Sequence, residues 1–353
     1  MSYQVLIEPL GETIEVEEGQ TILDAALRAG IYLPHACGHG LCGTCKVDII
    51  EGDVEHGDAS PFALMDMEKD EGKCLSCCAI PTSDLEIEAD VEEDEDAQNH
   101  PVRDYVGVVT KIETVTPRIK SIFIALQENI EFQAGHYINL NLPEVDEYPR
   151  AFSISNPPSD KNQIELNISL VQNGKGTKWI HEELRVGDEL KFSGPYGRFF
   201  VRESAPEPMI FLAGGSGLSS PKSMIMDLFE RDEKRDVTLI YGARNQDELY
   251  YHELFTEMSV EHSNFTYIPA LSDEPELSGW QGARGFVHVA AKEHFNGKFS
   301  GHKAYMCGPP PMVDACITTL MQGRLFERDM FMENFYTKDS QEAVSKSPLF
   351  KSI

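Results

Sequence analysis

The N-terminal part of the chain combines a strand pattern, a helix pattern and a second strand pattern. Apolar side chains alternate with others over residues 3–9 and 12–17, which predicts a β-hairpin. The segment between Thr21 and Gly30 has an apolar stripe at helical spacing, with a hydroxyl side chain to cap its start and a glycine to end it. Another strand is expected over residues 46–50. This order is typical of a small α+β domain.

A second region, residues 105–200, consists of short apolar segments separated by Gly, Pro or Asn. Strand patterns predict six of them, over residues 105–109, 119–126, 137–142, 151–155, 164–171 and 189–193. Six short strands in one region indicate a closed antiparallel β-barrel. A helix is expected over residues 177–184, directly after the turn Gly174-Lys175-Gly176, and the amides at such a helix start are suited to a phosphate.

Residues 207–335 alternate apolar strands with amphipathic helices, which predicts a doubly wound parallel sheet. The first strand, residues 209–213, runs into Gly214-Gly215-Ser216-Gly217, the turn at which such folds bind a nucleotide. The turn lacks the third glycine of G-x-G-x-x-G, and no Lys-Ser/Thr pair follows as in a P-loop. Alone it is a weak signal. Together with the preceding barrel it suggests a flavin module joined to a nicotinamide module.

Three cysteines stand close together in residues 37–45, with the spacing C-x4-C-x2-C: Cys37, Cys42 and Cys45. Plant-type ferredoxins hold a [2Fe–2S] cluster through a loop with this spacing. Glycines occupy three further positions of the loop, and a chain wound tightly around an inorganic core needs their freedom to adopt positive φ. The segment therefore predicts a one-electron carrier.

Other interpretations of the cysteines are weaker, and counting does not select the fourth ligand. Cys74, Cys77 and Cys78 are all candidates, and for Cys74 and Cys78 a buried small hydrophobic side chain is the preferred role. A Rieske site with His35 and His39 is disfavoured, because Rieske ligands come as two separated Cys-x-His pairs. A disulfide framework is disfavoured because no export signal is evident.

Acidic side chains outnumber basic ones, with 59 Asp and Glu against 30 Lys and Arg and a net charge of −29. Nucleic acid is not expected as a partner, because phosphate binding needs clustered Lys and Arg. Residues 84–104 form an acidic segment that predicts a linker between domains, with a docking strap as the alternative. No apolar run long enough for a membrane span and no secretory signal are evident, so no membrane contact and a cytoplasmic location are expected.

Three motifs resemble those of ferredoxin–NADP reductase-like flavoproteins. Arg150-Ala151-Phe152-Ser153 resembles their Arg-x-Tyr/Phe-Ser motif, and Cys307-Gly308-Pro309-Pro310-Pro311-Met312 resembles their C-G-P-x-x-M motif. Gly194-Pro195-Tyr196-Gly197 is similar to the turn that closes their flavin barrel. One departure lies in the family's motif Gly-Thr/Ser-Gly-x-Ala-Pro. In this chain Ser220 stands at the position of the motif's proline, and Pro221 follows it. The glycines that approach a nucleotide are retained.

The resemblance implies roles for individual residues. Arg150 would pair with the flavin pyrophosphate, Phe152 would pack against the isoalloxazine, and Ser153 would donate a hydrogen bond near flavin N5. Ala151 belongs to the same flavin-binding run. At the helix start after the glycine turn, Gly176 and Thr177 would meet a phosphate.

At the nicotinamide end, the resemblance implies that Cys307 faces the nicotinamide beside Gly308 and Pro309. Glu333 and Phe335 would lie beside the flavin, which makes Ser153, Cys307 and Glu333 the predicted catalytic residues. In the N-terminal domain, Leu75-Ser76-Cys77 followed by Ala79 and Pro81 resembles the Leu-Thr-Cys-x-Ala-x-Pro segment of plant-type ferredoxins. This resemblance implies that Cys77 is the fourth ligand.

The expected architecture is multidomain. It comprises a plant-type ferredoxin domain (1–90), an acidic linker (91–101), a flavin-binding β-barrel (102–204), an α/β nicotinamide-binding domain (205–336) and a tail (337–353). This order resembles the reductase components of bacterial multicomponent oxygenases, and the stretches 36–40, 60–66, 213–221 and 320–329 are similar to the reductases of phenol hydroxylases. The domain order implies FAD rather than FMN. Acidic residues after the second and third strands of the last domain favour NADH over NADPH.

The implied function is electron transfer from NADH, through FAD and a [2Fe–2S] cluster, to a separate hydroxylase. Alternatives are a reductase of another diiron monooxygenase, of a ring-hydroxylating dioxygenase or of deoxysugar dehydration. A non-enzymatic iron–sulfur redox sensor is the alternative of another class.

Overall fold

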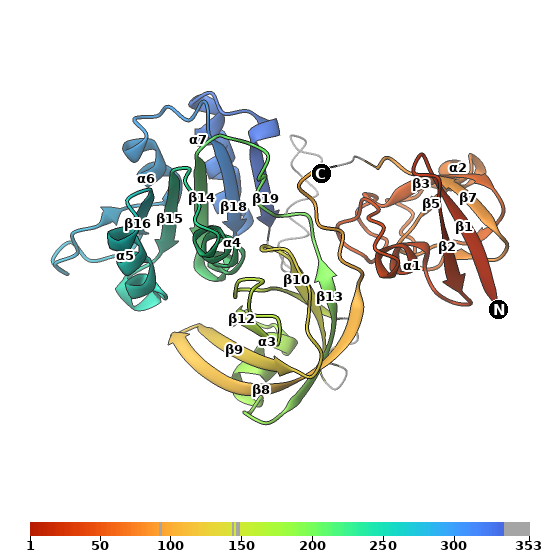
Figure 1. The fold of residues 1–353 in the computed structure, drawn as a ribbon, viewed down its shortest axis with the longest axis horizontal. Coiled ribbons are helices and arrows are strands. Elements are labelled where there is room, and N and C mark those ends of the chain that lie inside the picture. Colours follow the sequence, from red (N-terminus) through yellow and green to blue (C-terminus); the bar gives the residue numbers. More distant parts are fainter. Residues whose placement is uncertain (92–93, 143–144, 146–148, 335–353) are drawn as a thin grey trace. The chain divides into compact units, whose positions relative to one another are not determined.

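The computed structural model describes residues 1–91, 94–142, 145 and 149–334 of the chain. Two compact units divide it, one within residues 1–103 and the other beginning at residue 104. Each unit has its own sheets and its own hydrophobic core (Figure 1).

The first unit is a five-stranded sheet with one main helix packed on its core. The strand order is β2-β1-β7-β3-β5. These strands are β1 (Ser2–Glu8), β2 (Glu12–Glu17), β3 (Lys46–Glu51), β5 (Lys73–Leu75) and β7 (Leu85–Glu88). The other elements are a small two-stranded sheet of β4 (Val54–Glu55) and β6 (Ile80–Pro81), and the helices α1 (Ile22–Arg28) and α2 (Asp66–Asp70).

The predicted hairpin and helix of this unit are confirmed. β1 and β2 pair antiparallel, and the alternation buries Val5 and Ile14, which are paired in register. At the start of α1, the Thr21 hydroxyl accepts a hydrogen bond from the Asp24 amide at 3.3 Å. The helix then buries its apolar stripe in the same core.

The acidic segment that begins at residue 84 is not all linker, and this part of the prediction is wrong. Residues 85–88 form β7, which lies between β1 and β3 in the middle of the sheet. Leu85 and Ile87 are buried, while Glu86 and Glu88 alternate with them toward the other face. The many acidic residues made the segment look like a linker, although its apolar residues recur at every second position, as is typical of a strand.

Further along, the chain packs onto α1 before it leaves the unit. The amide of Val102 donates to the carbonyl of Leu27 at 3.0 Å, and the Pro101 ring lies where a Cβ on Gly30 would make contact at 3.4 Å. The end of the predicted linker is thus part of the first unit.

The second unit begins with the predicted six-stranded antiparallel barrel. Its sheet order is β11-β10-β13-β8-β9-β12, and a bridge between Ile154 and Leu166 joins the two edges. The elements are β8 (Arg103–Thr116), β9 (Ile119–Leu126), β10 (Tyr137–Asn141), β11 (Arg150–Ser153), β12 (Gln163–Ser169), α3 (Lys175–Glu182) and β13 (Glu189–Tyr196). Because the bridge removes the open edges, the sheet is closed.

A six-stranded parallel sheet follows in the same unit, with order β17-β16-β15-β14-β18-β19. Its strands are β14 (Met209–Gly214), β15 (Val237–Ala243), β16 (Phe265–Leu271), β17 (Ala283–Arg284), β18 (Lys303–Gly308) and β19 (Met330–Asn334). The connections contain α4 (Ser219–Glu230), α5 (His252–Glu261), α6 (Val287–His294), α7 (Pro310–Gln322) and the 3-10 turns η1 (Gly215–Leu218), η2 (Gln246–Glu248) and η3 (Glu327–Asp329).

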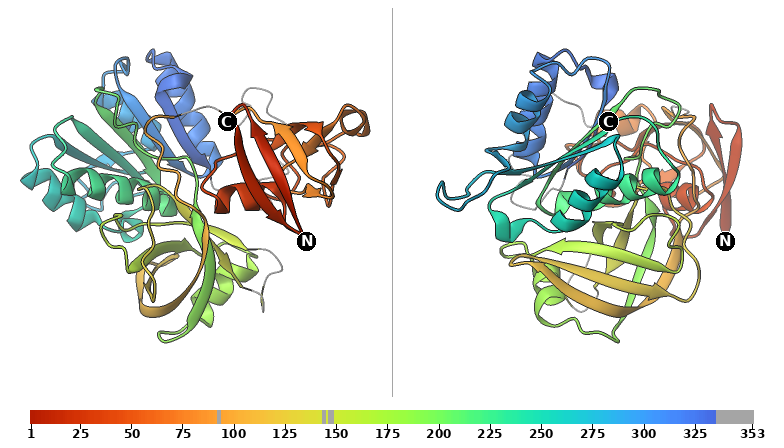
Figure 2. Two further views of the ribbon diagram at one scale, coloured as in Figure 1. Left: turned by 45° about the vertical axis from the view of Figure 1, so that its right-hand side comes forward. Right: turned by 60° about the vertical axis from the view of Figure 1, so that its left-hand side comes forward.

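Helices cover both faces of this sheet, as the prediction of a doubly wound fold requires (Figure 2). Along β14, Phe211 packs with α4 and α5, whereas Ile210 and Leu212 pack with α6 and α7. The central strand is therefore apolar on both sides, and the carboxyl ends of β14, β18 and β19 lie along one edge of the sheet.

Candidate functional site

The loop of residues 37–45 is tightly wound. Its three glycines have φ values of +69°, +71° and +77°, at Gly38, Gly40 and Gly43 respectively. A Cβ on Gly40 would lie 2.6 Å from the Cys78 sulfur and 3.1 Å from Ala59 Cα. Side chains other than hydrogen are excluded at this point both by backbone conformation and by space.

The loop brings its thiols together with Cys77 in two pairs. The sulfurs of Cys45 and Cys77 lie 3.1 Å apart, although the two residues are distant in sequence. Cys37 and Cys42 share a side-chain hydrogen bond. The amides of the loop residues His39 and Leu41 both donate to the Cys37 sulfur at 3.4 Å. Backbone donors of this kind favour the thiolate form that metals bind.

Hydrogen bonding between the paired thiols separates their pKa values. The hydrogen bond from Cys37 lowers the pKa of Cys42 to about 4, and the one from Cys77 lowers the pKa of Cys45 to about 7. Cys74 differs, because burial raises its pKa to about 12 and its side chain belongs to the hydrophobic core. A thiol in that state is a packing residue.

The donor set fits a two-iron cluster, because its thiols lie in two pairs. Across the described residues, no group of three or more His, Cys, Asp or Glu side chains surrounds a position for one metal ion. Two separate thiol pairs are what a [2Fe–2S] cluster needs, because four thiolates are divided between its two irons. Cys78 also lies close, with its sulfur 3.6 Å from that of Cys77.

In the second unit, β11 carries the predicted flavin-binding run. Arg150 and Phe152 are half-buried, Ala151 is exposed and Ser153 is buried. β11 pairs with β10 such that Phe152 lies opposite Ile138 and Ser153 lies opposite Tyr137. The run thus lies on the barrel strand that pairs with β10, just before the bridge that closes the barrel.

Helix α3 begins at Lys175, earlier than the predicted start at Thr177. Gly174 is the N-cap, so Gly176 and Thr177 belong to the first turn, whose amides have no partner within the helix. The Thr177 hydroxyl donates to the Gly174 carbonyl at 3.4 Å and accepts from the Val171 amide at 3.1 Å. Its present role is to shape the turn before the helix, while the first-turn amides keep the geometry of an anion site.

The glycine turn after β14 packs directly against the segment after β18. A Cβ on Gly217 would lie 2.4 Å from the Cys307 carbonyl oxygen and 2.6 Å from Gly308 Cα. Met312 occupies the space beside both Gly214 and Gly308, at 2.4 Å and 2.7 Å from the Cβ positions of those glycines. The backbone contacts at Gly217 explain why this position of the turn needs glycine, whereas the flexible end of Met312 fills the space beside Gly214 and Gly308.

Replacing Gly217 by alanine is expected to weaken nicotinamide binding while FAD binding is retained. The added methyl group would meet backbone atoms of Cys307 and Gly308, which cannot move as a flexible side chain can. Titration of the FAD-loaded variant with NAD+ measures the effect, and we expect a Kd at least about tenfold higher than for the unchanged chain. Thr318→Ala, an exposed change on α7, is the control and should bind normally. Normal binding by Gly217→Ala would contradict the packing argument.

Ser153, Cys307 and Glu333, predicted separately, are brought together by the fold. Oε2 of Glu333 accepts hydrogen bonds from the Ser153 hydroxyl at 3.0 Å and the Ser220 hydroxyl at 2.8 Å, and lies 3.6 Å from the Cys307 sulfur. Cys307 and Glu333 are register neighbours on β18 and β19. Ser153 of the barrel, Ser220 of α4 and Cys307 of β18 therefore all lie beside one carboxylate oxygen. This oxygen belongs to Glu333 on β19.

The contribution of Ser220 was missed from the sequence. The signal was present, because a hydroxyl residue stands where the family motif has proline. Burial raises the pKa of Glu333, and burial beside that carboxyl raises the pKa of Cys307 well above its ordinary value. The thiol stays protonated, and the carboxyl holds its proton to a higher pH than an exposed one.

Comparison with known proteins accounts for the whole chain. Three family models match: a 2Fe-2S iron-sulfur cluster binding domain over residues 5–82, an oxidoreductase FAD-binding domain over 107–201 and an oxidoreductase NAD-binding domain over 211–317. The reductase component of phenol 2-monooxygenase, DmpP, from Pseudomonas sp. (strain CF600) is 60% identical over 100% of both chains. The chain belongs to the family of monooxygenase reductase components.

A second relative and a solved structure extend the likeness. The phenol hydroxylase P5 protein of Acinetobacter pittii (strain PHEA-2) is 54% identical, also over 100% of both chains. The crystal structure of the Amycolatopsis cytochrome P450 reductase GcoB has a TM-score of 0.85 and 31% identity, and the match covers 94% of this chain and 98% of that one. The family models confirm the predicted fold class, the oxidoreductase activity and the cofactors [2Fe–2S], FAD and NAD.

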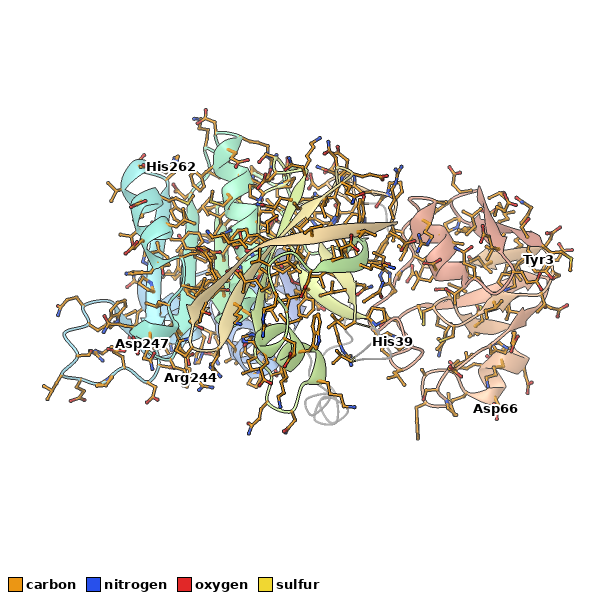
Figure 3. All side chains as sticks on the ribbon, turned by 90° about the horizontal axis from the view of Figure 1, so that it is seen from below. Tyr3, His39, Asp66, Arg244, Asp247 and His262 are labelled. Atoms are coloured by element: carbon orange, nitrogen blue, oxygen red, sulfur yellow. The ribbon has the colours of Figure 1, made fainter. Side chains whose placement is uncertain are left out.

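Two acidic residues that suggested NADH have partners in the fold. Glu248 accepts two hydrogen bonds from the Arg118 guanidinium, at 3.1 Å and 2.9 Å. Glu274 accepts from the backbone and side-chain amides of Gln246, at 3.0 Å and 2.6 Å. Arg244 and Asp247, both labelled in Figure 3, lie in the segment that follows β15, and both are exposed.

Two remaining predictions concern Phe335 and membrane-spanning helices. Phe335, predicted to lie beside the flavin, is outside the described residues. No helix in the described part of the chain is both long enough and apolar enough to cross a membrane.

Proposed function

We propose that this chain is the NADH-dependent reductase component that delivers electrons, through FAD and a [2Fe–2S] cluster, to the hydroxylase of a phenol monooxygenase. The observation that carries the proposal is the presence on one chain of two thiol pairs and of the Ser153–Cys307–Glu333 site. Phenol as the substrate of the partner rests on the full-length likeness to DmpP.

The residues proposed to hold the cofactors come from all three domains. Cys37, Cys42, Cys45 and Cys77 would bind the irons, and the flavin and nicotinamide contacts would come from Arg150, Ala151, Phe152, Ser153, Gly176, Thr177, Gly214, Gly215, Gly217, Gly308, Pro309 and Phe335. When bound, FAD accepts a hydride from NADH and the cluster carries electrons singly, which together convert a two-electron donor into a one-electron supply.

Glu333 is proposed to hold and release a proton beside the hydride-transfer site. Its Oε2 is the common acceptor for the Ser153 and Ser220 hydroxyls, so a proton released or needed at Ser153 has a short path to a carboxyl group. The raised pKa of Glu333 widens the pH range over which it can hold that proton. Cys307, buried against the same oxygen, would shield the site from water.

NADH is expected to be preferred over NADPH by at least about tenfold in kcat/KM, because a 2′-phosphate needs a basic pocket. The exposed Asp247, three residues after Arg244 in the chain, opposes such a pocket. Steady-state reduction of ferricyanide with each nucleotide measures the preference. Asp247→Arg should narrow it by improving NADPH alone, whereas Glu257→Arg on the exposed side of α5 should leave it unchanged. A preference for NADPH in the unchanged chain would refute this choice.

A second candidate is a reductase with the same chemistry and a different oxygenase partner. The 31% identity to GcoB, named as a cytochrome P450 reductase, favours it, because one architecture is found with different partners. Reconstitution separates the two candidates. Phenol-dependent NADH consumption should appear with a phenol hydroxylase oxygenase and not with a ring-hydroxylating dioxygenase. NADH-dependent reduction of cytochrome c by the isolated chain would exclude the redox sensor.

We further propose the domain limits 1–90, 91–101, 102–204, 205–336 and 337–353, supported by the matched ranges of the three family models. A cytoplasmic location is proposed because thiols that bind a cluster stay reduced there.

A further inference from the structure

A buried ion pair joins the barrel to the parallel sheet. Nζ of Lys222 in α4 lies 2.8 Å from Oε2 of Glu165 in β12. The two side chains are only 7% and 6% exposed. Burying opposite charges in this way is seldom a gain in stability over apolar packing, so the pair invites another explanation.

Side chains from the same region of α4 also form hydrogen bonds to the segment that continues the flavin-binding run. Lys222 donates to the Ser155 carbonyl at 3.1 Å, and the buried Ser223 hydroxyl donates to the Asn156 carbonyl at 2.7 Å. Ser155 and Asn156 directly continue the run that contains Ser153. Two successive carbonyls of the barrel are therefore held by successive side chains of one helix.

Tyr251 completes this contact from a second helix. Its hydroxyl donates to Oε1 of Glu165 and lies 3.2 Å from the Ser121 hydroxyl, while Nζ of Lys222 lies 4.6 Å from the centre of its ring. Tyr251 has φ of +56° at the start of α5, a conformation that costs free energy for a bulky side chain. In this conformation the Tyr251 hydroxyl contacts Glu165 and Ser121, which both belong to the barrel.

The contacts continue from this cluster to the active edge of the sheet. Tyr250, the residue before Tyr251, donates to the carbonyl of Gly215 in the nucleotide turn at 3.2 Å. Ser220, two residues before Lys222, donates to Glu333. Thus the cluster of Glu165, Lys222 and Tyr251 is linked by one or two residues to the glycine turn, to the catalytic carboxyl and to Ser153.

We propose that Lys222 is a positioning residue for hydride transfer, which acts with Glu165 and Tyr251 to set the nucleotide turn and α4 in a fixed register against the flavin-binding strand. The inference rests on the proposed function, because it assumes that NADH reduces FAD at this edge. Hydride transfer requires the donor and acceptor atoms to be placed within a fraction of an ångström. Directional charge and hydrogen-bond contacts restrict sliding between two packed surfaces in a way that apolar contacts do not.

The test compares Lys222→Met with a matched control in the same fold. Lys303 and Asp329 form a partly buried pair at 2.8 Å that lies wholly within the α/β part, so Lys303→Met removes an ion pair without touching the barrel. Anaerobic stopped-flow mixing of the FAD-loaded proteins with NADH gives the limiting rate of flavin reduction and the apparent Kd of NADH. Lys222→Met should lower the limiting rate at least about tenfold and change the Kd less than about threefold.

Hydrogen–deuterium exchange provides a readout that does not depend on activity. In the FAD-free and FAD-loaded chains, Lys222→Met should increase exchange in peptides covering residues 150–156, whereas Lys303→Met should not. A limiting rate within about twofold of the unchanged protein, or an equal loss in Lys303→Met, overturns the proposal. So does unchanged exchange over residues 150–156.

Two milder variants keep the proposal testable if Lys222→Met does not fold. Glu165→Gln removes one charge and Tyr251→Phe removes one donor, with little change in side-chain volume. Unchanged limiting rates in both overturn the proposal, and a loss in either supports it. If the unchanged holoprotein is not reduced by NADH at all, the proposed function fails, while the exchange experiment still reports whether the cluster holds the flavin-binding strand.

Discussion

Replacing Cys77 by serine is expected to abolish the visible absorbance of the [2Fe–2S] cluster and to stop electron delivery to the oxygenase. The sulfur of Cys77 is 3.1 Å from that of Cys45, a cysteine of the 37–45 loop. A serine hydroxyl is a much poorer iron ligand than a thiolate, because it stays protonated at neutral pH, so one iron would lose its strong ligand. NADH-dependent reduction of ferricyanide should persist, because the flavin and nicotinamide domains carry no residue of this site.

Two neighbouring cysteines are the controls for this assignment. Cys78→Ser changes a sulfur 3.6 Å from Cys77, and Cys74→Ser changes a core thiol whose pKa burial raises to about 12. Both variants should keep the cluster absorbance and iron content, although Cys74→Ser places a hydroxyl in the core and should unfold at a lower temperature. A full cluster in Cys77→Ser, with loss of the cluster in Cys78→Ser or Cys74→Ser, would assign the fourth ligand to that other cysteine.

Replacing Glu333 by glutamine is expected to slow flavin reduction by NADH about 100-fold, the usual scale for loss of a positioned proton-transfer group. Glutamine keeps the shape of the side chain but cannot hold or release the proton beside Ser153, to which Glu333 is hydrogen-bonded at 3.0 Å. The limiting rate at saturating NADH measures the effect. Glu327→Gln, an exposed change earlier in the same segment, is the control. A rate within about threefold of the unchanged enzyme would remove Glu333 from the mechanism.

The same carboxyl should give the protein a pH-dependent stability. Its pKa is raised in the folded chain above the ordinary value of 4.5, so the folded state keeps a proton that the unfolded state releases as the pH rises past 4.5. The unfolded state then binds fewer protons, and the free energy of unfolding falls with rising pH until the folded-state pKa is passed. Urea unfolding of the FAD-free chain at a series of pH values should show a smaller fall in Glu333→Gln. Equal falls in both proteins would contradict the raised pKa.

Local patterns predicted the elements whose stability is decided locally. Thr21 caps α1 because a hydroxyl at that place satisfies a free amide, and the alternation of β1 and β2 survives because one face of the sheet is buried. The thiol loop was equally clear, since its spacing and glycines follow from the chemistry of the cluster itself.

The sequence was less informative where the fold depends on partners distant in the chain. β7 looked like linker because its glutamates outweigh two apolar side chains, and only its place between β1 and β3 makes it a strand. Lys222 gave no signal because its partner Glu165 lies far away in sequence, and the departure from the motif at Ser220 did not reveal its distant partner Glu333. No periodicity or local motif reports a contact of that kind.

The most direct measurement follows both chromophores in one chain. The oxidised holoprotein is mixed anaerobically with NADH, and absorbance is recorded where the flavin and the cluster each dominate. We predict that flavin absorbance falls first and cluster absorbance follows, that Cys77→Ser shows the flavin phase alone, and that a phenol hydroxylase oxygenase then reoxidises the cluster. A cluster that stays oxidised while electrons reach the oxygenase would contradict the proposed route.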